Sequence, residues 1–354
     1  MTKRIGFACK WIDSPSQIDG IKPKDDCKKY NTGSTTVAWL NRQTKDVACE
    51  KLWSLMEQNI AACHILVERV GALDENLRMV RLSSDILPVY TEPTWSWFWR
   101  QPDVRRYCER HFSALGHVAR SRDVRLSFHP GQFTVLASDN ADIVDRSIEE
   151  FEYHVDMARW MGYGKTFQDF KINVHIAGRQ GPAGIRAALS RLTPEARNTI
   201  TIENDEITWG IEASLELVDN LALVLDIHHH YIKTGEYILP SDDRFKRIVD
   251  SWRGARRPVI HYSYSRDEHL PGGFKHDEFP DLEKLLESGH KKSKLRAHSD
   301  FYPNEKVNAW ALSFLETADI MAESKGKNLA SFALYEQYKT IAEPLVCDRE
   351  PLIF

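Results

Sequence analysis

The stretch LALVLDIHHH, residues 221–230, decides the fold class of this chain, because its character changes sharply at one residue. Residues 221–225 are continuously apolar, Asp226 follows directly, and three histidines come after Ile227. An apolar run of this length is typical of a strand that is buried on both faces, as in a parallel sheet covered by helices. We therefore predict a buried strand over residues 221–226 that delivers polar side chains where it ends.

The same pattern recurs along the chain. Short runs rich in Val, Ile, Leu and Phe alternate with longer segments in which apolar residues recur three and four positions apart. This alternation favours βαβ units, and eight strands close a TIM barrel, so we predict an α/β fold of the (β/α)8 type. The predicted strands cover residues 4–8, 78–83, 124–129, 171–176, 199–203, 221–226, 258–262 and 319–323. The predicted helices cover residues 46–62, 101–121, 139–161 and 326–340.

Two connections are unusually long, namely residues 9–45 after the first strand and residues 263–297 after the seventh. Connections of this length inside one domain are usually functional. We find no internal repeat, low-complexity tract or Pro/Ser-rich linker in the sequence. We therefore expect residues 1–354 to form a single barrel domain.

The composition excludes several classes of protein. The formal net charge is -4, so any binding of nucleic acid has to come from a local basic patch. The six cysteines form no CxxC pair, which argues against a disulfide framework and against a cysteine zinc site. No segment approaches the roughly 18 consecutive apolar residues that a membrane span needs. We expect an intracellular, cytoplasmic protein without an obligate protein partner.

Side chains that can bind metal ions stand at or just after the ends of several predicted strands. The carboxyl ends of barrel strands meet at one rim, where catalytic residues converge. One histidine at a strand end is more often a hydrogen-bonded structural residue than a ligand, but a buried group of imidazoles and carboxylates is costly unless a cation neutralises it. Mixed histidine and carboxylate ligation suits Mn²⁺, Zn²⁺ or Fe²⁺, and the number of ligands predicts at least two ions. The expected ligands are His129, His175, Glu203, Asp226, His229, His261 and Glu323.

Basic and aromatic stretches surround these strand ends. A basic run leads to His298 on the side of the barrel where the site lies, and we expect it to contact phosphates, although most such runs are simply solvated. The residues of this run are Lys291, Lys292, Lys294 and Arg296. A second run, RGARR at residues 253–257, precedes a strand and should lie at the opposite rim as a solvated face. The aromatic cluster at residues 95–99 either packs a helix or walls a substrate groove.

Nine motifs occur in an order that resembles the UV damage endonuclease family. They are RIGFACK, RLSS, LSFHPGQF, INVHIAG, TIEND, LVLDIHHH, PVIHYS, RAHSDFY and ADIMAESKGK, and they span residues 4 to about 330. The resemblance implies a barrel akin to endonuclease IV and xylose isomerase, with up to three metal ions, typically manganese. It also implies incision of DNA immediately 5′ to UV photoproducts, leaving a 3′-hydroxyl and a 5′-phosphate. His298 joins the implied ligands, and Gln132 and Phe133 occupy the positions of the lesion-probing pair.

The sequence departs from the family pattern at several positions. Glu92 stands where the family usually offers a histidine ligand, and a carboxylate there would favour manganese or magnesium. Val259 replaces a lysine that can be modified to reach the metals, and Phe133 replaces a tyrosine. Phe7 and Trp11 occupy positions where a tyrosine and an asparagine are expected near the damaged strand.

The leading hypothesis is metal-dependent hydrolysis of damaged double-stranded DNA. It uses two to three divalent ions, with Mn²⁺ first and Zn²⁺, Mg²⁺ or Fe²⁺ as alternatives. Glu203 is the expected bridging ligand, while His175 and His298 orient water or phosphate. Two alternatives stay open: a sugar isomerase or epimerase on the same barrel, and a lesion-binding relative with a weakened metal cluster.

Overall fold

Eight short parallel strands close into a barrel in their order along the chain in a computed structural model that describes residues 1–18 and 27–342. The strands are β1 Ile5–Ala8, β2 Met79–Arg81, β3 Arg125–Phe128, β4 Lys171–His175, β5 Ile200–Glu203, β6 Ala222–Asp226, β7 Val259–Tyr262 and β8 Asp319–Ala322. The predicted TIM barrel is confirmed, and each predicted strand overlaps an observed one. Residues 19–26, within the first long connection, and 343–354 lie outside the described part.

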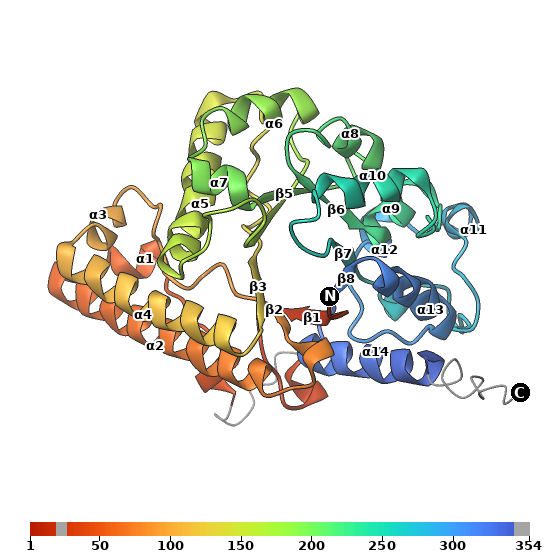
Figure 1. The fold of residues 1–354 in the computed structure, drawn as a ribbon, viewed down its shortest axis with the longest axis horizontal. Coiled ribbons are helices and arrows are strands. Elements are labelled where there is room, and N and C mark those ends of the chain that lie inside the picture. Colours follow the sequence, from red (N-terminus) through yellow and green to blue (C-terminus); the bar gives the residue numbers. More distant parts are fainter. Residues whose placement is uncertain (19–26, 343–354) are drawn as a thin grey trace, which may run out of the picture.

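Helices pack around the barrel, and four of them correspond to the predicted helices. These are α2 Lys45–Gly71, α4 Pro102–Ser121, α5 Ala141–Trp160 and α14 Lys327–Ala342. Figure 1 shows α2 and α4 side by side along one flank of the barrel and α14 beneath β1. The shorter helices are α1 Val37–Leu40, α3 Ser96–Trp99, α6 Gly181–Leu189, α7 Pro194–Thr199, α8 Ile211–Leu215, α9 Ile227–Thr234, α10 Asp243–Ser251, α11 Leu282–Glu287, α12 Lys292–Leu295 and α13 Glu305–Ser313.

Side-chain capping explains where several of these helices begin. Asn140 caps α5 by accepting hydrogen bonds from the backbone N–H groups of Asp142 and Ile143, while Thr44 caps α2. Asp226 both ends β6 and caps α9, so a single residue turns the chain from strand to helix.

The strands alternate their side chains between two environments, as a barrel requires. One set packs outward against the helices in the large apolar core, which includes Phe7, Val174 and Ile260. The other set points into the barrel, where Val224 and Val259 contribute to a smaller apolar cluster. Asp226 and His261 follow these two residues by two positions and therefore share their inward direction.

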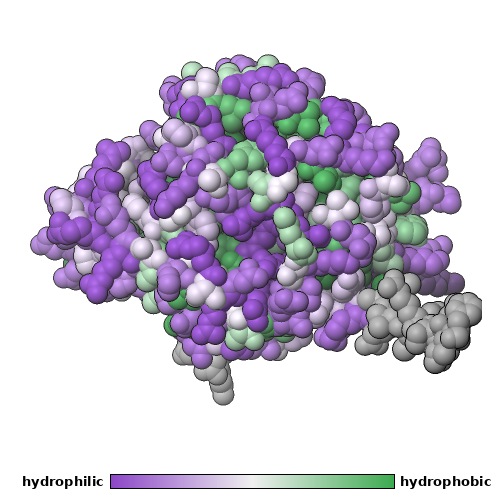
Figure 2. Space-filling view, in the orientation of Figure 1, coloured by the Kyte–Doolittle hydropathy of each residue, from purple (hydrophilic) through white to green (hydrophobic). Residues whose placement is uncertain are grey.

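Hydrophilic side chains cover most of the face shown in Figure 2, and apolar surface is broken into small patches. Within the described residues, none of the helices combines the length and the apolar character needed to cross a membrane. The long connection over residues 263–297 is ordered into α11, α12 and a single 3-10 turn, Asp267–His269, with irregular segments between them.

Candidate metal centre

The strand register brings the predicted ligands to one end of the barrel. In the β4–β5 pair His175 lies opposite Glu203, and in the β6–β7 pair Asp226 lies opposite His261. His129 follows the last residue of β3 directly, and Glu323 follows the last residue of β8. All seven residues that the strand ends predicted as ligands therefore lie at the carboxyl rim.

Glu203 is the centre of this cluster and is fully buried. Its Oε2 atom lies 3.4 Å from His129 Nε2 and 3.1 Å from His261 Nδ1. Its Oε1 atom lies 3.4 Å from His229 Nδ1. One carboxylate therefore faces imidazole nitrogens on both of its oxygens, as a ligand shared between ions must.

Three overlapping groups of side chains each offer three ligand atoms within 4.8 Å of one another. Glu203 belongs to two of these groups and His261 to two, so the groups form one continuous centre. The groups are His129–Glu203–His261, His175–Glu203–His229 and Asp226–His261–Glu323.

The unpaired atoms of the cluster test whether these residues fit metal ions. Glu203 Oε1, Asp226 Oδ2 and His261 Nδ1 are buried and have no hydrogen-bond partner among the described residues. Buried polar atoms are normally paired, because an unsatisfied one costs about 1–3 kcal/mol. Each of these atoms belongs to a residue of the three groups, and carboxylate oxygens and imidazole nitrogens are ligands for divalent metals. The residues present therefore fit a multinuclear metal centre.

A surrounding layer of hydrogen bonds fixes the orientation of the ligands. The Thr201 hydroxyl donates to Asn173 Oδ1 at 2.7 Å, and Asn173 Nδ2 donates to Glu203 Oε2, which leaves Glu203 Oε1 free. His129 Nδ1 lies 2.9 Å from the Pro130 carbonyl oxygen, so its Nε2 is the nitrogen that faces Glu203. Such partners set ring orientation and tautomer in metal sites.

The charges in the cluster shift the pKa values of its members in opposite directions. Burial raises the pKa of Asp226 well above its usual range. Burial would also raise the pKa of Glu203, but the His261 and His175 imidazoles outweigh it and hold that pKa well below its usual range. Burial lowers the pKa of His261 to about 4. For His229, the Asp226 and Glu203 carboxylates overcome burial and raise the pKa to about 9.

Lys171 is a member of the site that the sequence analysis missed. Its Nζ lies 3.0 Å from His261 Nε2 inside the barrel, and burial lowers its pKa to about 7. Val259, which stands in place of the family's lysine, is buried in the apolar cluster of the barrel interior. The lysine amine beside His261 thus comes from β4. Lys171 is four residues before His175 on the same strand, so the alternation of side chains would have revealed its inward direction.

Two further charged residues of the site were also missed. Arg81 at the end of β2 forms an ion pair with Glu323. Glu206 lies 3.7 Å from His229 Nε2 through its Oε2 and 2.8 Å from Arg296 Nη1 through its Oε1. Arg81 ends a strand, but arginine is not a metal ligand, and Glu206 lies three residues beyond the end of β5, outside the strand-end pattern.

Glu92 does not join the cluster. Its Oε2 accepts a hydrogen bond of 3.0 Å from the backbone N–H of Trp95, and its side chain lines a pocket that none of the clustered ligands lines. The expectation that Glu92 binds metal is not supported by this position, because the loop after β2 places it in this pocket and outside the ligand cluster. The carboxylate is used instead at the start of α3.

His298 lies beside the cluster and belongs to none of its three groups. The negative charge of Glu323 acts on it, although burial dominates and lowers its pKa. The two histidines that flank His229 in the sequence are also buried outside the cluster. His228 Nε2 lies 3.3 Å from the Leu295 carbonyl oxygen, and His230 Nε2 lies 3.0 Å from Glu236 Oε2. Neither is exposed.

Phe7 and Trp11 were expected near the damaged strand, and the structure places both in the apolar core. Phe7 points outward from β1, and its ring contacts Trp11 edge to face at 5.8 Å. Trp11 also contacts Tyr30 and Phe332, and the Arg69 guanidinium lies 4.4 Å from its ring centroid. The prediction is wrong because both aromatic side chains are used to pack helices against the first strand.

Gln132 and Phe133 stand at the rim beside the cluster. Gln132 is exposed, and Phe133 is 71% exposed, which is unusual for a large apolar side chain. Gly131 permits this arrangement, because a Cβ at that position would lie 2.4 Å from the Phe133 ring. The turn after β3 therefore presents one amide and one aromatic ring to solvent.

A cavity of about 160 Å³ connects Gln132 with the cluster and with the basic run. Its lining includes His175, His229, Glu206 and Arg296. Of the four predicted phosphate-contacting residues, only Arg296 lines this cavity. The other three, Lys291, Lys292 and Lys294, are exposed, and Lys292 donates to the Lys233 carbonyl oxygen at 2.7 Å. In the aromatic cluster, Trp95, Phe98 and Trp99 are buried in the core, as helix packing predicts.

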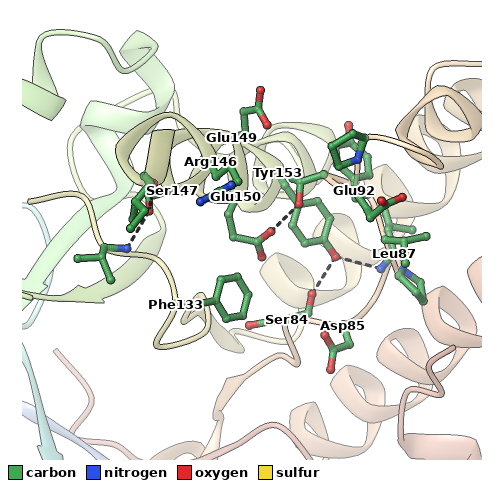
Figure 3. Close-up of a pocket in the computed structure, with 17 residues that line it drawn as sticks. Ser84, Asp85, Leu87, Glu92, Phe133, Arg146, Ser147, Glu149, Glu150 and Tyr153 are labelled. Carbon is green, nitrogen blue, oxygen red and sulfur yellow. Dashed lines mark hydrogen bonds between the residues drawn. The ribbon is translucent and has the colours of Figure 1, made fainter. Parts of the chain in front are cut away.

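A larger pocket of about 620 Å³ opens on the other side of Phe133, between the loop after β2 and α5 (Figure 3). Figure 3 shows the Tyr153 hydroxyl bridging Ser84 and Leu87 at the base, with the Phe133 ring and the Glu150 carboxylate facing the same space. Glu150 accepts a hydrogen bond of 2.9 Å from the Thr91 hydroxyl. Burial raises the pKa of Glu150 to about 7.

Replacing Glu150 with glutamine should stabilise the protein at pH 8 and leave its stability at pH 4 nearly unchanged. The folded-state pKa of Glu150 lies above the unfolded-state value, so the folded state loses relative stability as pH rises toward 7. Removing the titration should raise the free energy of unfolding at pH 8 by about 3 kcal/mol. Urea unfolding at both pH values measures this difference. The neighbouring exposed Glu149, replaced in the same way, should show no such pH dependence; equal behaviour of the two variants would rule the effect out.

Known proteins resemble this chain in sequence and in fold. The sequence matches the family described as UV-endonuclease UvdE over residues 4–348. The UV DNA damage endonuclease of Bacillus velezensis is 27% identical over 361 residues, covering 96% of this chain and 95% of the relative. The UV-damage endonuclease of Schizosaccharomyces pombe is 26% identical over 279 residues, covering 74% of this chain and 41% of the relative.

Two solved structures share the barrel. The crystal structure of SacUVDE aligns with a TM-score of 0.68 and 20% identity, covering 97% of this chain and 99% of SacUVDE. Endonuclease IV from Thermus thermophilus aligns with a TM-score of 0.51 and 16% identity, covering 80% of this chain and 94% of the enzyme. At these identities the structural likeness establishes the fold alone. On the strength of the nearly full-length family match, the chain belongs to the UV-endonuclease UvdE family, whose members are DNA repair endonucleases.

Proposed function

We propose that this protein hydrolyses the DNA phosphodiester immediately 5′ to UV photoproducts or other lesions, leaving a 3′-hydroxyl and a 5′-phosphate, with two to three divalent metal ions. The observation that supports it most is the group of unpaired buried ligand atoms on Glu203, Asp226 and His261, next to an exposed aromatic turn. Mn²⁺ is the first choice, and Zn²⁺, Mg²⁺ or Fe²⁺ are alternatives.

The metal ions would be held by the three groups described above. When bound, divalent ions polarise phosphoryl oxygens and stabilise charge on the attacking and leaving oxygens of a phosphodiester. Glu203 is the shared ligand, because it faces imidazoles on both oxygens while Asn173 fixes one of them. His175 and His298, at the edge of the cluster, orient water or phosphate. Arg296, held by Glu206, contributes positive charge beside the same cavity.

Lesion recognition follows from the turn after β3. A photoproduct weakens base stacking, so a wedge can enter damaged DNA at a lower cost than intact DNA. Gln132 and Phe133 form this wedge, since they are exposed beside the cluster. Phenylalanine stacks on bases but donates no hydrogen bond, so recognition here depends on stacking and on the Gln132 amide.

An incision assay separates this proposal from its alternatives. Metal-loaded protein is incubated with a UV-irradiated, end-labelled duplex, with the intact duplex, and with a free aldose or ketose. Nicks confined to the irradiated duplex, lost with chelator and restored by Mn²⁺, are the expected result. Binding to damaged DNA without nicking at excess metal would replace the proposal with a lesion-binding role. Sugar turnover without nicking would replace it with an isomerase.

Replacing Phe133 with alanine should weaken discrimination between damaged and intact duplex about tenfold, because base–aromatic stacking contributes roughly 1–3 kcal/mol. Bound metal should not change, since the ring does not line the cluster. Competition binding with the two duplexes, together with elemental analysis, measures both quantities. Phe279, which is also partly exposed but lies elsewhere, provides the matched control. Unchanged selectivity in the Phe133 variant would remove the wedge from the proposal.

A further inference from the structure

A cavity of about 270 Å³ lies at the opposite end of the barrel from the metal centre, where β3 and β8 begin. Four arginines and two aspartates line it: Arg4, Arg125, Arg256, Arg257, Asp123 and Asp319. The second basic run of the sequence, residues 253–257, therefore contributes two of its three arginines to a cavity. Four guanidinium groups against two carboxylates leave an excess of two positive charges.

Both carboxylates of the cavity already accept hydrogen bonds from its arginines. Asp319 accepts hydrogen bonds from Arg125 Nη1 at 2.5 Å, from Arg257 Nε at 3.0 Å and from the Arg4 backbone N–H at 3.0 Å. Asp123 accepts from Arg4 Nη2 at 2.5 Å. Arg257 is satisfied further by the carbonyl oxygens of Leu315 and Glu316. The acidic groups therefore cannot neutralise the remaining guanidinium charge.

Two arginines of the cavity, Arg4 and Arg256, have N–H donors without an acceptor among the described residues. Arg4 is nine-tenths buried, and its Nε atom has no hydrogen-bond partner in the part of the chain that the structure describes. Arg256 is exposed and makes no hydrogen bond or ion pair with any described residue, although its charge reaches the buried Arg125. A network that only closed the barrel end would pair these donors. An anion that enters the cavity would supply the missing acceptor and the missing negative charge.

We propose that this arginine cavity, lined by Arg4, Arg125, Arg256 and Arg257, binds a phosphate dianion, either free or as the phosphate of a mononucleotide. Guanidinium groups present paired N–H donors that match phosphate oxygens, and the charge excess matches a dianion. The site is separate from the metal centre, because β3 and β8 place Arg125 and Asp319 at their first residues and His129 and Glu323 after their last. It is also independent of the proposed incision chemistry.

Equilibrium dialysis of the full-length, metal-loaded protein against radiolabelled inorganic phosphate tests this proposal. Phosphate can also bind a metal centre, so the same titration is made on Glu203→Gln. We expect Arg256→Ala to weaken binding at the arginine cavity at least about tenfold, since a charge-assisted hydrogen bond is lost. Arg256→Lys keeps the charge but loses the planar guanidinium. Its phosphate affinity should lie between those of the unaltered protein and Arg256→Ala.

Arg253→Ala is the matched control, because Arg253 belongs to the same run but lies over the Phe167 ring outside the cavity. It should bind phosphate like the unaltered protein. Glu203→Gln loses any phosphate that the metal centre holds, but it should keep the binding at the arginine cavity that Arg256→Ala weakens. Thymidine 5′-monophosphate and thymidine then separate the two sources: tighter binding of the monophosphate than of phosphate assigns a mononucleotide, and equal binding assigns free phosphate. Equal phosphate binding by Arg256→Ala and the unaltered protein, or binding lost only in Glu203→Gln, would overturn the site.

Discussion

Replacing Glu203 with glutamine is expected to lower incision of UV-irradiated duplex by roughly 10²- to 10³-fold, the size of effect seen when one charge-stabilising group is removed from a preorganised site. Glutamine keeps the size of the side chain and the hydrogen bond from Asn173, but it replaces a carboxylate oxygen that faces imidazoles with a neutral amide. Bound metal should fall, while binding of damaged DNA through the exposed rim should persist. Single-turnover incision, elemental analysis and DNA binding measure the three quantities.

Glu92→Gln is the matched control for this prediction. The same chemical change at a glutamate that lies outside the cluster should leave incision within about twofold of the unaltered protein. This control also decides the position at which the family resemblance and the structure disagree. Incision by Glu203→Gln at the rate of the unaltered protein would refute the shared-ligand role, and a large loss in Glu92→Gln would return Glu92 to the site.

Replacing Asp319 with alanine should destabilise the protein by about 3–5 kcal/mol, because removing one partner of a buried ion pair leaves an uncompensated charge. Arg125 and Asp319 are both buried, and Asp319 accepts from two arginine side chains as well as from a backbone N–H. The loss should appear as a lower midpoint of urea unfolding. It measures how strongly this pair closes the amino-terminal end of the barrel.

Glu316→Ala is the control for the Asp319 prediction. Glu316 forms an ion pair with Lys3, but its side chain is 73% exposed. Exposed pairs contribute about 0–1 kcal/mol, so this variant should change little. Similar unfolding midpoints for the two variants would mean that burial of the Arg125–Asp319 pair contributes no more than a surface contact.

Much of the site was predictable because strand ends and side-chain alternation are local properties. The run that ends at Asp226 predicts both a buried strand and an inward carboxylate, and the same logic identifies His175 and His261. Lys171 shows that the same alternation extends back to the first residue of a strand. It is the first residue of its strand and follows the polar residues Gln168 and Asp169 closely, so only the direction shared with His175 reveals that it is buried.

The remaining errors concern loops and side-chain packing, which depend on distant parts of the chain. Whether Glu92 reaches the metals depends on the path of the loop after β2, which no local pattern sets. Phe7 and Trp11 have the residue types of a DNA-stacking surface and of an apolar core alike, and contacts with residues as distant as Phe332 decide between the two. The arginine cavity likewise joins residues of four separate segments, so its excess charge appears only when the barrel closes.

The most direct test of the proposed function is the position and chemistry of the nick on a duplex that carries one defined photoproduct. Metal-depleted protein is supplied with Mn²⁺, and both strands are end-labelled and sequenced. We expect one nick at the phosphodiester immediately 5′ to the lesion, with a 3′-hydroxyl that a polymerase extends and a 5′-phosphate that a ligase accepts. Cleavage at the lesion's 3′ side, a 3′-phosphate end, or equal cleavage without divalent metal would contradict it.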